Sequence, residues 1–590
     1  MGDAERLLQS DTPALCLSPL KRAGSESFMN TLAFIRSSVH PALERALFAA
    51  FASLSSIAAA AELPRGVPVE PTREINQFFD RARGEAFERG LELERERARR
   101  AEKEVPSAPA APKAPASGPV FTLRGVDHSP SAVLTEEDVQ KAAAPWLGRK
   151  IRLSDVFELV ETLNRRYLEK GCVVCRATVE PQRIQGGRIR ITLTEGRTGS
   201  VAVKGNRTTK ESFIRGAFSV ESGEVVDFRA LTRDLTAFNL THDAALTVDM
   251  HAGKEPGTTD YEITAHEPPP LRAGVFADTM GASDSGRVRA GADFTWASPF
   301  GRRDRLSLIG LASRGAKSLS LAYMVPLTAR GLSLGATVTG GSVNVVEGDA
   351  AALDISGRSF SSSLRLEDVF AAGTAGRASV FGEITQARSM TDMLGLRFHD
   401  ERALSQSLGL TGALFGRGWD AALTQAVHAT RVKNRLQNDS SEYFRTTGTL
   451  FLEARPVQNF SFRFRGSWQA MLGGDSPASS DVFSLGASTY VRGYPNDTLT
   501  AEGGAAVSFE LEWAGLEGRT PVMVFLDAGR LWGESEFARR SLASTGLTVT
   551  APLWSGASLS AAAAVPLQRT PYAGADVPGA RFDLVFSARW

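Results

Sequence analysis

The residues with the most specific chemistry in this sequence are an arginine and an aspartate in its last third, Arg492 and Asp527. Arg492 stands in Val491-Arg492-Gly493-Tyr494, at the far end of a loop rich in glycine and serine. Asp527 stands in Phe525-Leu526-Asp527-Ala528-Gly529. A guanidinium and a carboxylate form a planar, bidentate ion pair that a lysine cannot reproduce. We therefore interpret the two residues as a pair that fixes the position of a loop.

Strand parity is the reason to join these two residues. In the run 522–527 aliphatic residues occupy alternate positions, so in a strand Val524 and Leu526 share one face and Asp527 lies on the other. If the aliphatic face meets lipid, Asp527 faces the interior of a barrel and can meet an inserted arginine. Gly493 permits a close approach of the loop backbone. The alternative interpretation is an ordinary arginine in an exposed loop.

Other motifs that could carry chemistry lack the context they need. Cys172-Val173-Val174-Cys175 is expected in a strand, where residues three apart point to opposite faces, and no second Cys or His pair accompanies it for zinc. Gly331-Leu332-Ser333-Leu334-Gly335 matches a nucleophile elbow by letter but lies in an alternating run rather than a strand–turn–helix. Gly474-Asp475-Ser476 reads as loop. We expect no enzyme activity, no cofactor and no metal site.

Composition excludes some classes of protein. The chain has 590 residues and a net charge of +1, so no strong field favours nucleic acid, and the length predicts more than one domain. The sequence contains no internal run of about 18 apolar residues, and so it predicts no membrane-spanning helix in the body of the chain. Strands that span a membrane alternate apolar and polar residues, so their average hydropathy resembles that of a soluble protein.

The N-terminal fifth is predicted to contain a leader, a helix and a tether. An apolar run at 46–61 that ends in small residues predicts a signal peptide over residues 1–61, cleaved after Ala60 or Ala61, with either Met1 or Met29 as the start. Residues 71–105 predict one helix, apolar at first and then dense in Glu and Arg, either a solvated spacer or a helix in a wet lumen. Residues 106–119 are a Pro/Ala-rich linker.

Two small α/β modules follow, at 120–196 and 197–268. In the first, Thr135 and Asp138 resemble a capping box, a second helix begins at Ser154, and strands are expected at 172–179 and 188–194. The second repeats the plan, and its expected elements are a strand at 201–203, helices near 209–217 and 228–239, and strands at 245–250 and 259–265. Each module is therefore predicted to have the order β-α-α-β-β.

Residues 270–590 predict a transmembrane β-barrel. Alternating segments recur roughly every 20 residues between Gly/Ser/Asp/Pro loops, and they give about sixteen strands, with weak segments near 331–342, 356–367 and 375–388. Lipid requires closure, since an open edge would leave backbone groups unpaired. The last strand carries aromatic residues on one face, Phe586 and the terminal Trp590 among them. The alternative is a soluble β-sandwich.

This arrangement resembles the two-partner secretion transporters of the BamA-like superfamily, the haemolysin and filamentous-haemagglutinin exporters. Val491-Arg492-Gly493-Tyr494 matches the family's pore-loop motif, and Phe525, Asp527 and Gly529 match its F-x-D-x-G strand motif. The resemblance implies a membrane all-β fold, with a 16-stranded barrel, two periplasmic POTRA domains and an N-terminal plug helix at 71–105. It also implies that Phe586 and Trp590 form an assembly signal for the barrel assembly machinery.

The function implied by the resemblance is export without ATP. An unfolded secreted partner protein, such as a large β-helical adhesin, haemolysin or toxin, would bind the POTRA domains and cross the barrel to the surface of a Gram-negative bacterium. The expected partners are this client, outer-membrane lipid and the assembly machinery, and no nucleic acid. The main alternative is a BamA-like assembly factor or insertase. A passive porin and a barrel-anchored surface lipase are further alternatives.

Overall fold

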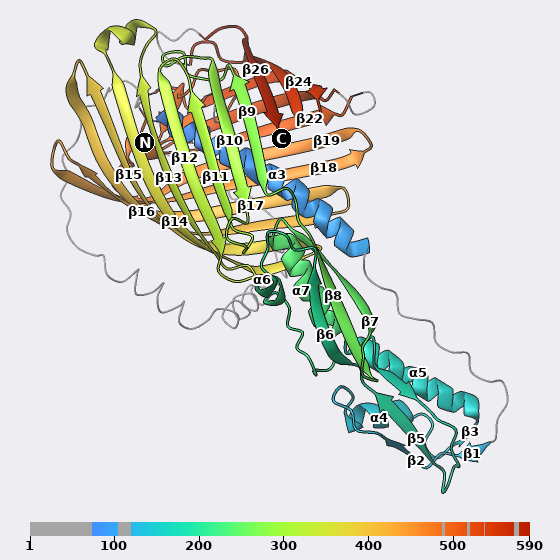
Figure 1. Cartoon of the computed structure of the whole chain (residues 1–590). Coiled ribbons are helices and arrows are strands. Elements are labelled where there is room, and N and C mark those ends of the chain that lie inside the picture. Colours follow the sequence, from blue (N-terminus) through green and yellow to red (C-terminus); the bar gives the residue numbers. More distant parts are fainter. Residues whose placement is uncertain (1–72, 104–119, 487–489, 516–519, 536, 572–576) are drawn as a thin grey trace, which may run out of the picture. The chain divides into compact units, whose positions relative to one another are not determined.

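The computed structural model describes residues 73–103, 120–486, 490–515, 520–535, 537–571 and 577–590 (Figure 1). The predicted signal peptide at 1–61 and the predicted linker at 106–119 lie outside these residues. Within the described ranges, none of the helices combines the length and the apolar character that a bilayer-spanning helix needs.

The first module is a small sheet covered by two helices. Its strands form a three-stranded sheet in the order β2-β5-β4 and a short pair β1-β3. Thr135 and Asp138 form the predicted capping box at the start of the first helix. Both helices pack on one apolar core that includes Leu159, Leu163 and Ile191. The elements are β1 (Phe121–Thr122), β2 (Gly125–His128), α4 (Glu136–Ala143), β3 (Lys150–Ile151), α5 (Leu153–Glu169), β4 (Arg176–Thr178) and β5 (Arg188–Thr194).

The cysteine pair corrects one sequence prediction. Cys172 and Cys175 form a disulfide in the turn between α5 and β4, and they do not lie in a strand. The Cys172 N–H donates to the Tyr167 carbonyl at 2.9 Å, so the backbone still closes the last turn of α5 there. This turn brings the two Cα atoms to 5.4 Å, within the range that a disulfide requires. The prediction of opposite faces assumed a strand period that begins only at β4.

The second module has the predicted order β-α-α-β-β. It contains β6 (Arg197–Lys204), α6 (Glu211–Arg215), α7 (Phe228–Thr241), β7 (Ala245–Ala252) and β8 (Thr258–His266), and its sheet order is β6-β8-β7. Phe213, Phe238 and Ile263 lie in its core. The Lys210 N–H donates to the Gly301 carbonyl at 2.8 Å, so the module contacts the loop that follows the second barrel strand.

The rest of the chain forms a closed antiparallel barrel, and the predicted number of sixteen strands is confirmed. The segments with weak alternation are full strands, β13 to β15. Ser333 is the first residue of β13, so the G-x-S-x-G match leads into a strand and not a helix. The strands are β9 (Leu271–Asp278), β10 (Arg289–Ala297), β11 (Arg305–Ala312), β12 (Ala316–Pro326), β13 (Ser333–Asn344), β14 (Ser356–Gly373), β15 (Gly376–Met393), β16 (Leu396–Gly416), β17 (Trp419–Asn434), β18 (Asp439–Val457), β19 (Phe460–Gly474), β22 (Gly503–Trp513), β23 (Val522–Trp532), β24 (Ser541–Trp554), β25 (Ala557–Pro566) and β26 (Arg581–Arg589).

The two faces of the barrel wall differ as the alternation predicts. On β23 the side chains of Val524 and Leu526 are exposed, whereas Phe525 and Asp527 are buried. The wall closes between the last strand and the first, with Val585–Arg589 of β26 opposite Gly274–Asp278 of β9 (Figure 1). Because the apolar side chains point outward, the polar inward face must find its partners within the lumen.

Two segments occupy that lumen, namely the helix α3 (Arg73–Lys103) and the loop between β19 and β22. Phe78 of α3 stacks on Phe276 of β9, with ring centroids 5.8 Å apart, and Leu91 packs with Ala413 and Ala422. The loop contains a small antiparallel pair, β20 (Phe483–Leu485) and β21 (Leu499–Ala501), which packs against buried residues of β22 to β24. Both segments thus lie against inward-facing residues of the wall.

Candidate functional site

The loop motif at 491–494 lies on the inner wall of the barrel. Val491 and Tyr494 are buried in an apolar cluster with Leu485, Leu499 and Leu531. The Tyr494 hydroxyl lies 2.7 Å from Gln568 Oε1 and 2.9 Å from the Ala543 carbonyl oxygen. These contacts attach the loop to the wall on one side of Arg492 and direct the arginine side chain toward β22 and β23.

Two glycines allow this close packing. Gly493 has φ +95°, a left-handed conformation that disfavours other residues, and a Cβ there would lie 3.2 Å from Ala564 Cβ. Gly529, the last residue of the strand motif, faces the loop, and a Cβ there would lie 2.4 Å from Leu485 Cδ2. The loop can therefore rest on β23 only where the strand lacks a side chain.

Arg492 and Asp527 meet as a bidentate ion pair. Arg492 Nε donates to Asp527 Oδ2 at 2.8 Å, and Nη2 donates to Oδ1 at 2.7 Å. The Arg492 backbone N–H also donates to Asp527 Oδ2, at 2.9 Å. The Asp527 carboxylate is almost fully buried. The structure thus brings the loop motif and the strand motif together at these two residues, which we call the latch pair.

Three further residues surround the guanidinium; Phe525 belongs to the strand motif predicted from the sequence, whereas Ser508 and Glu510 were not predicted. The Arg492 guanidinium carbon lies 3.6 Å from the centroid of the Phe525 ring, a cation–π contact. Arg492 Nη2 donates to Ser508 Oγ at 2.8 Å and lies 2.9 Å from Glu510 Oε1. Ser508 stands opposite Asp527 in the β22–β23 register, and Glu510 stands opposite Phe525.

The sequence carried part of the information that would have identified these residues. Ser508 and Glu510 occupy alternate, polar positions of β22, which is the pattern that marks Asp527 as inward-facing. What the sequence lacked was the register between the two strands. That register appears only in the paired strands, so parity alone could not select which inward residue meets Arg492.

Glu510 extends the site toward α3. The residue is 4% exposed, and its carboxylate also pairs with Arg465 of β19. Arg465 in turn forms two hydrogen bonds with Glu88 of α3, from Nε at 2.7 Å and from Nη2 at 2.8 Å. A continuous series of alternating charges therefore joins the latch pair to the helix.

Other charged residues of α3 also pair with the wall. Arg95 Nη1 donates to Asp420 Oδ2 at 2.8 Å, and Glu94 lies 3.3 Å from Arg377 Nη1. At the other end of the helix, Arg73 Nε donates to the Ser479 carbonyl at 3.1 Å. Ion pairs at partly exposed positions are individually weak. The later, charged half of α3 is therefore attached to the wall by many replaceable contacts rather than by one apolar core.

The predicted assembly residues lie away from this site. Phe586 is on β26, where its ring centroid lies 6.1 Å from that of Trp554. Trp590 is 69% exposed, and its backbone N–H donates to the Ala273 carbonyl of β9 at 2.9 Å. These aromatic side chains lie on the outer face, next to the line where the barrel closes.

The groups of the lumen site are ones that hold a cation and position the segments that carry it. Within the residues that the structure describes, no group of three or more His, Cys, Asp or Glu side chains could hold a metal ion. The groups that converge on Arg492 are carboxylates, a hydroxyl and an aromatic face, all of which recognise a cation. The site therefore fixes a loop and a helix inside a pore.

A closed barrel of this kind, with an apolar outer face and a polar, occupied lumen, defines an outer-membrane β-barrel protein. The family model described as "Haemolysin secretion/activation protein ShlB/FhaC/HecB" matches residues 257–551, and a model for the ShlB-type POTRA domain matches residues 121–196. The chain belongs to this haemolysin secretion/activation family. Its barrel lies in the outer membrane, and its POTRA modules lie in the periplasm.

Several known proteins resemble the chain. The outer membrane transporter CdiB of Dickeya dadantii is 26% identical over 215 residues, which cover 35% of this chain and 38% of that protein. The hemolysin transporter protein HpmB of Proteus mirabilis is 24% identical over 242 residues, 40% of this chain and 39% of that protein. The aligned parts thus span well under half of these curated relatives. The solved structure of CdiB from Escherichia coli has a TM-score of 0.66 at 17% identity, covering 89% of this chain and all of that one, and it shares the fold.

Proposed function

We propose that this protein is the outer-membrane pore of a two-partner secretion system, which exports an unfolded partner protein to the cell surface without ATP. Membership of the haemolysin secretion/activation family supports this function, and so do relatives whose names describe transport of haemolysin and of heme/hemopexin. The observation that carries it is the lumen itself, in which α3 and the latch pair share one charged network. A passive channel needs no such network.

In this proposal α3 is a plug that leaves the pore when the partner protein enters. Ion pairs such as Glu88–Arg465 can exchange for water or for a client's side chains at little cost, because they are partly exposed. The latch pair is more deeply buried on its acidic side and would hold the loop in place while the helix moves. The loop then forms a fixed wall of the open pore.

The POTRA modules would receive the client. Each sheet has edge strands, β2 and β4 in the first and β6 and β7 in the second, and an extended polypeptide can add to such an edge through backbone hydrogen bonds. The client would be a large β-helical adhesin, haemolysin or toxin, and its folding outside the cell would drive export. Phe586 and Trp590 would serve the barrel assembly machinery during insertion.

The test is the substitution Arg492→Ala in cells that export a partner protein through this pore. We expect secretion to be lost while the barrel still inserts and shows heat-modifiable migration in gels, because the variant removes the bidentate contact and leaves the wall intact. Arg492→Lys should also fail, since an ammonium cannot form the planar pair. Arg530→Ala, which removes an exposed arginine from the same strand as Asp527, is the control and should secrete normally. Normal secretion by a folded Arg492→Ala variant would contradict the proposal.

A further inference from the structure

A group of basic side chains points outward at one end of the barrel. The side chains of Lys317, Arg358, Arg402 and Lys433 are all exposed. Lys317, Arg358 and Lys433 lie near the ends of β12, β14 and β17, and Arg402 lies on β16 opposite Lys433. Within the described residues, no Asp or Glu forms an ion pair with any of them. We call these four residues the basic band.

The basic band lies at the extracellular end of the wall. The opposite end carries the loops β10–β11 and β12–β13, which contact the second POTRA module: Ser298 Oγ donates to the Thr208 carbonyl at 2.9 Å, and the His242 ring lies 3.1 Å from the Ala329 carbonyl. The POTRA modules are periplasmic, so the loops that touch them mark the periplasmic end. The band therefore faces the outer leaflet of the membrane.

The strand register places like charges side by side. Arg402 of β16 stands directly opposite Lys433 of β17, and like charges in directly opposite positions destabilise a sheet. Lys317 and Arg358 both flank Ser342 of β13, one on each side. By contrast, the neighbouring Arg388 is neutralised by Asp400, with hydrogen bonds at 2.9 and 2.8 Å. A clustered set of cations without carboxylates points to an anion that is not part of the chain.

The apolar surface shows at what depth this anion lies. The next outward-facing residues toward the membrane are Leu319 beside Lys317, Phe360 beside Arg358 and Leu404 beside Arg402, and all three are exposed. On β12, β14 and β16 the side chains thus change from apolar to basic within one step of the strand period. On β17 the next outward residue is Arg431, which pairs with Glu442. This boundary is where the hydrocarbon of a bilayer meets its head groups.

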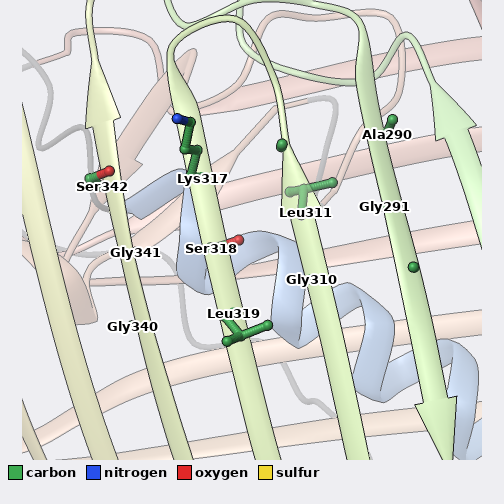
Figure 2. Close-up of a pocket in the computed structure, with 12 residues that line it drawn as sticks. Ala290, Gly291, Gly310, Leu311, Lys317, Ser318, Leu319, Gly340, Gly341 and Ser342 are labelled. Carbon is green, nitrogen blue, oxygen red and sulfur yellow. The ribbon is translucent and has the colours of Figure 1, made fainter.

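The wall beside the band is also hollowed. A shallow pocket on the outer face is lined by small residues of β10, β11 and β13, such as Ala292, Gly310 and Gly340, with Lys317 and Leu319 at its side (Figure 2). The inner face of the same strands is occupied by α3, whose Ile75 contacts Gly341. The outward hollow leaves room for an acyl chain directly below a basic side chain.

We propose that the basic band binds the phosphate groups of a phosphorylated glycolipid of the outer leaflet, with an acyl chain of the same lipid in the hollow. Arg and Lys donate charge-assisted hydrogen bonds to phosphate oxygens, and a lipid supplies the anion and the chain together. The inference concerns the outside of the barrel and does not depend on what passes through it.

The test measures lipid binding to the purified full-length protein in detergent by native mass spectrometry, with bisphosphorylated lipid A as the probe. The variant Arg402→Gln/Lys433→Gln should bind about 25-fold more weakly, because each cation near a lipid head group strengthens binding about fivefold and the two factors multiply. A second variant, Lys317→Gln/Arg358→Gln, changes residues on other strands and should show a similar loss. It keeps the test valid if the first variant misfolds. Lys254→Gln/Arg183→Gln removes two exposed cations from the POTRA modules and should bind like the unchanged protein.

The nature of the lipid is tested with two more probes. Dephosphorylated lipid A and phosphatidylglycerol should both bind at least about tenfold more weakly than bisphosphorylated lipid A. Exchanging the cations, as in Arg402→Lys/Lys433→Arg, should preserve binding. Unchanged affinity in both Gln variants would overturn the proposal, and so would equal binding of either control lipid.

Discussion

At the scale of the residue, the site is built around one guanidinium with more partners than a simple ion pair. Arg492 contacts Asp527, Ser508, Glu510 and the face of Phe525. The planar fork of arginine serves two acceptors in one plane while its face meets the ring, and an ammonium can do only one of these. Asp527 was expected from the sequence. Glu510 is the addition, and it connects two arginines.

The bridging role of Glu510 leads to a stability prediction. Glu510→Gln keeps the shape of the side chain but leaves Arg492 and Arg465 without the charge between them, so we expect the free energy of unfolding to fall by about 2–3 kcal/mol. The measurement is urea unfolding of the protein in lipid vesicles. Glu512→Gln is the matched control, because Glu512 lies on the same strand as Glu510 but pairs with one arginine, Arg463 of β19. An equal or smaller loss in Glu510→Gln would show that the bridge adds no stability.

At the scale of the element, α3 is a helix with two kinds of attachment. Its first turns bury Ile75, Phe78 and Phe79 against the barrel wall. Its later half is attached through charged side chains such as Glu88 and Arg95. The sequence left open a solvated spacer or a helix in a lumen. The contacts with barrel strands support the second interpretation, because the charged side chains find their partners on the inward face.

In the first POTRA module, the helices α4 and α5 are joined by one carboxylate. Lys170 Nζ donates to Asp138 Oδ2 at 2.5 Å, and the Thr135 N–H donates to the same oxygen at 2.9 Å. The hydrogen bond from Lys170, followed by that from the Thr135 backbone, lowers the pKa of Asp138 from its usual 3.8 to about 2. The ionised carboxylate therefore stabilises the start of α4.

This shift sets the sign of a pH dependence. Because the pKa is lower in the folded state, the stabilisation is fully present above pH 3.8 and is lost as the pH falls through about 2. We expect hydrogen exchange of the α4 amides, corrected for the intrinsic rate, to accelerate below pH 3.8. Asp138→Asn should exchange faster than the unchanged protein at pH 5 and match it near pH 2. A difference that stays constant over this range would contradict the assignment to Asp138.

At the scale of the whole molecule, the closed wall determines how every other part is used. Closure removes free strand edges, so the polar inward residues find their partners in one another, in water or in segments inside the lumen. The loop at 491–494 and α3 are those segments, and the charged series from Asp527 to Glu88 joins them. The outer face is left to lipid.

Removal of the helix tests its role as a plug. Deleting residues 71–105 should raise single-channel conductance in planar bilayers, because it empties a lumen that α3 otherwise fills. Glu88→Gln should raise the frequency of openings by weakening the contact with Arg465, whereas Glu92→Gln, at an exposed position of the same helix, should not. Unchanged conductance in the deletion variant would exclude a plug.

The sequence by itself determined the features that depend on local periodicity. Strand alternation set which side chains face outward, so the burial of Asp527 and the exposure of Leu526 follow from parity alone. The capping box at Thr135 and Asp138 could likewise be read from residues three apart. The number of strands followed from the length and spacing of the alternating segments.

Only the tertiary structure decided which inward residues meet. Glu510, Arg465 and Glu88 come from two strands and a helix far apart in the chain, and strand register and barrel closure place them together. The disulfide between Cys172 and Cys175 required the actual turn after α5, because a strand period would have separated the two side chains. The basic band also needed the register, since Arg402 and Lys433 are neighbours only across paired strands. Periodicity determines the face of the strand on which a side chain lies, whereas its partners depend on the strand register and on the closure of the barrel.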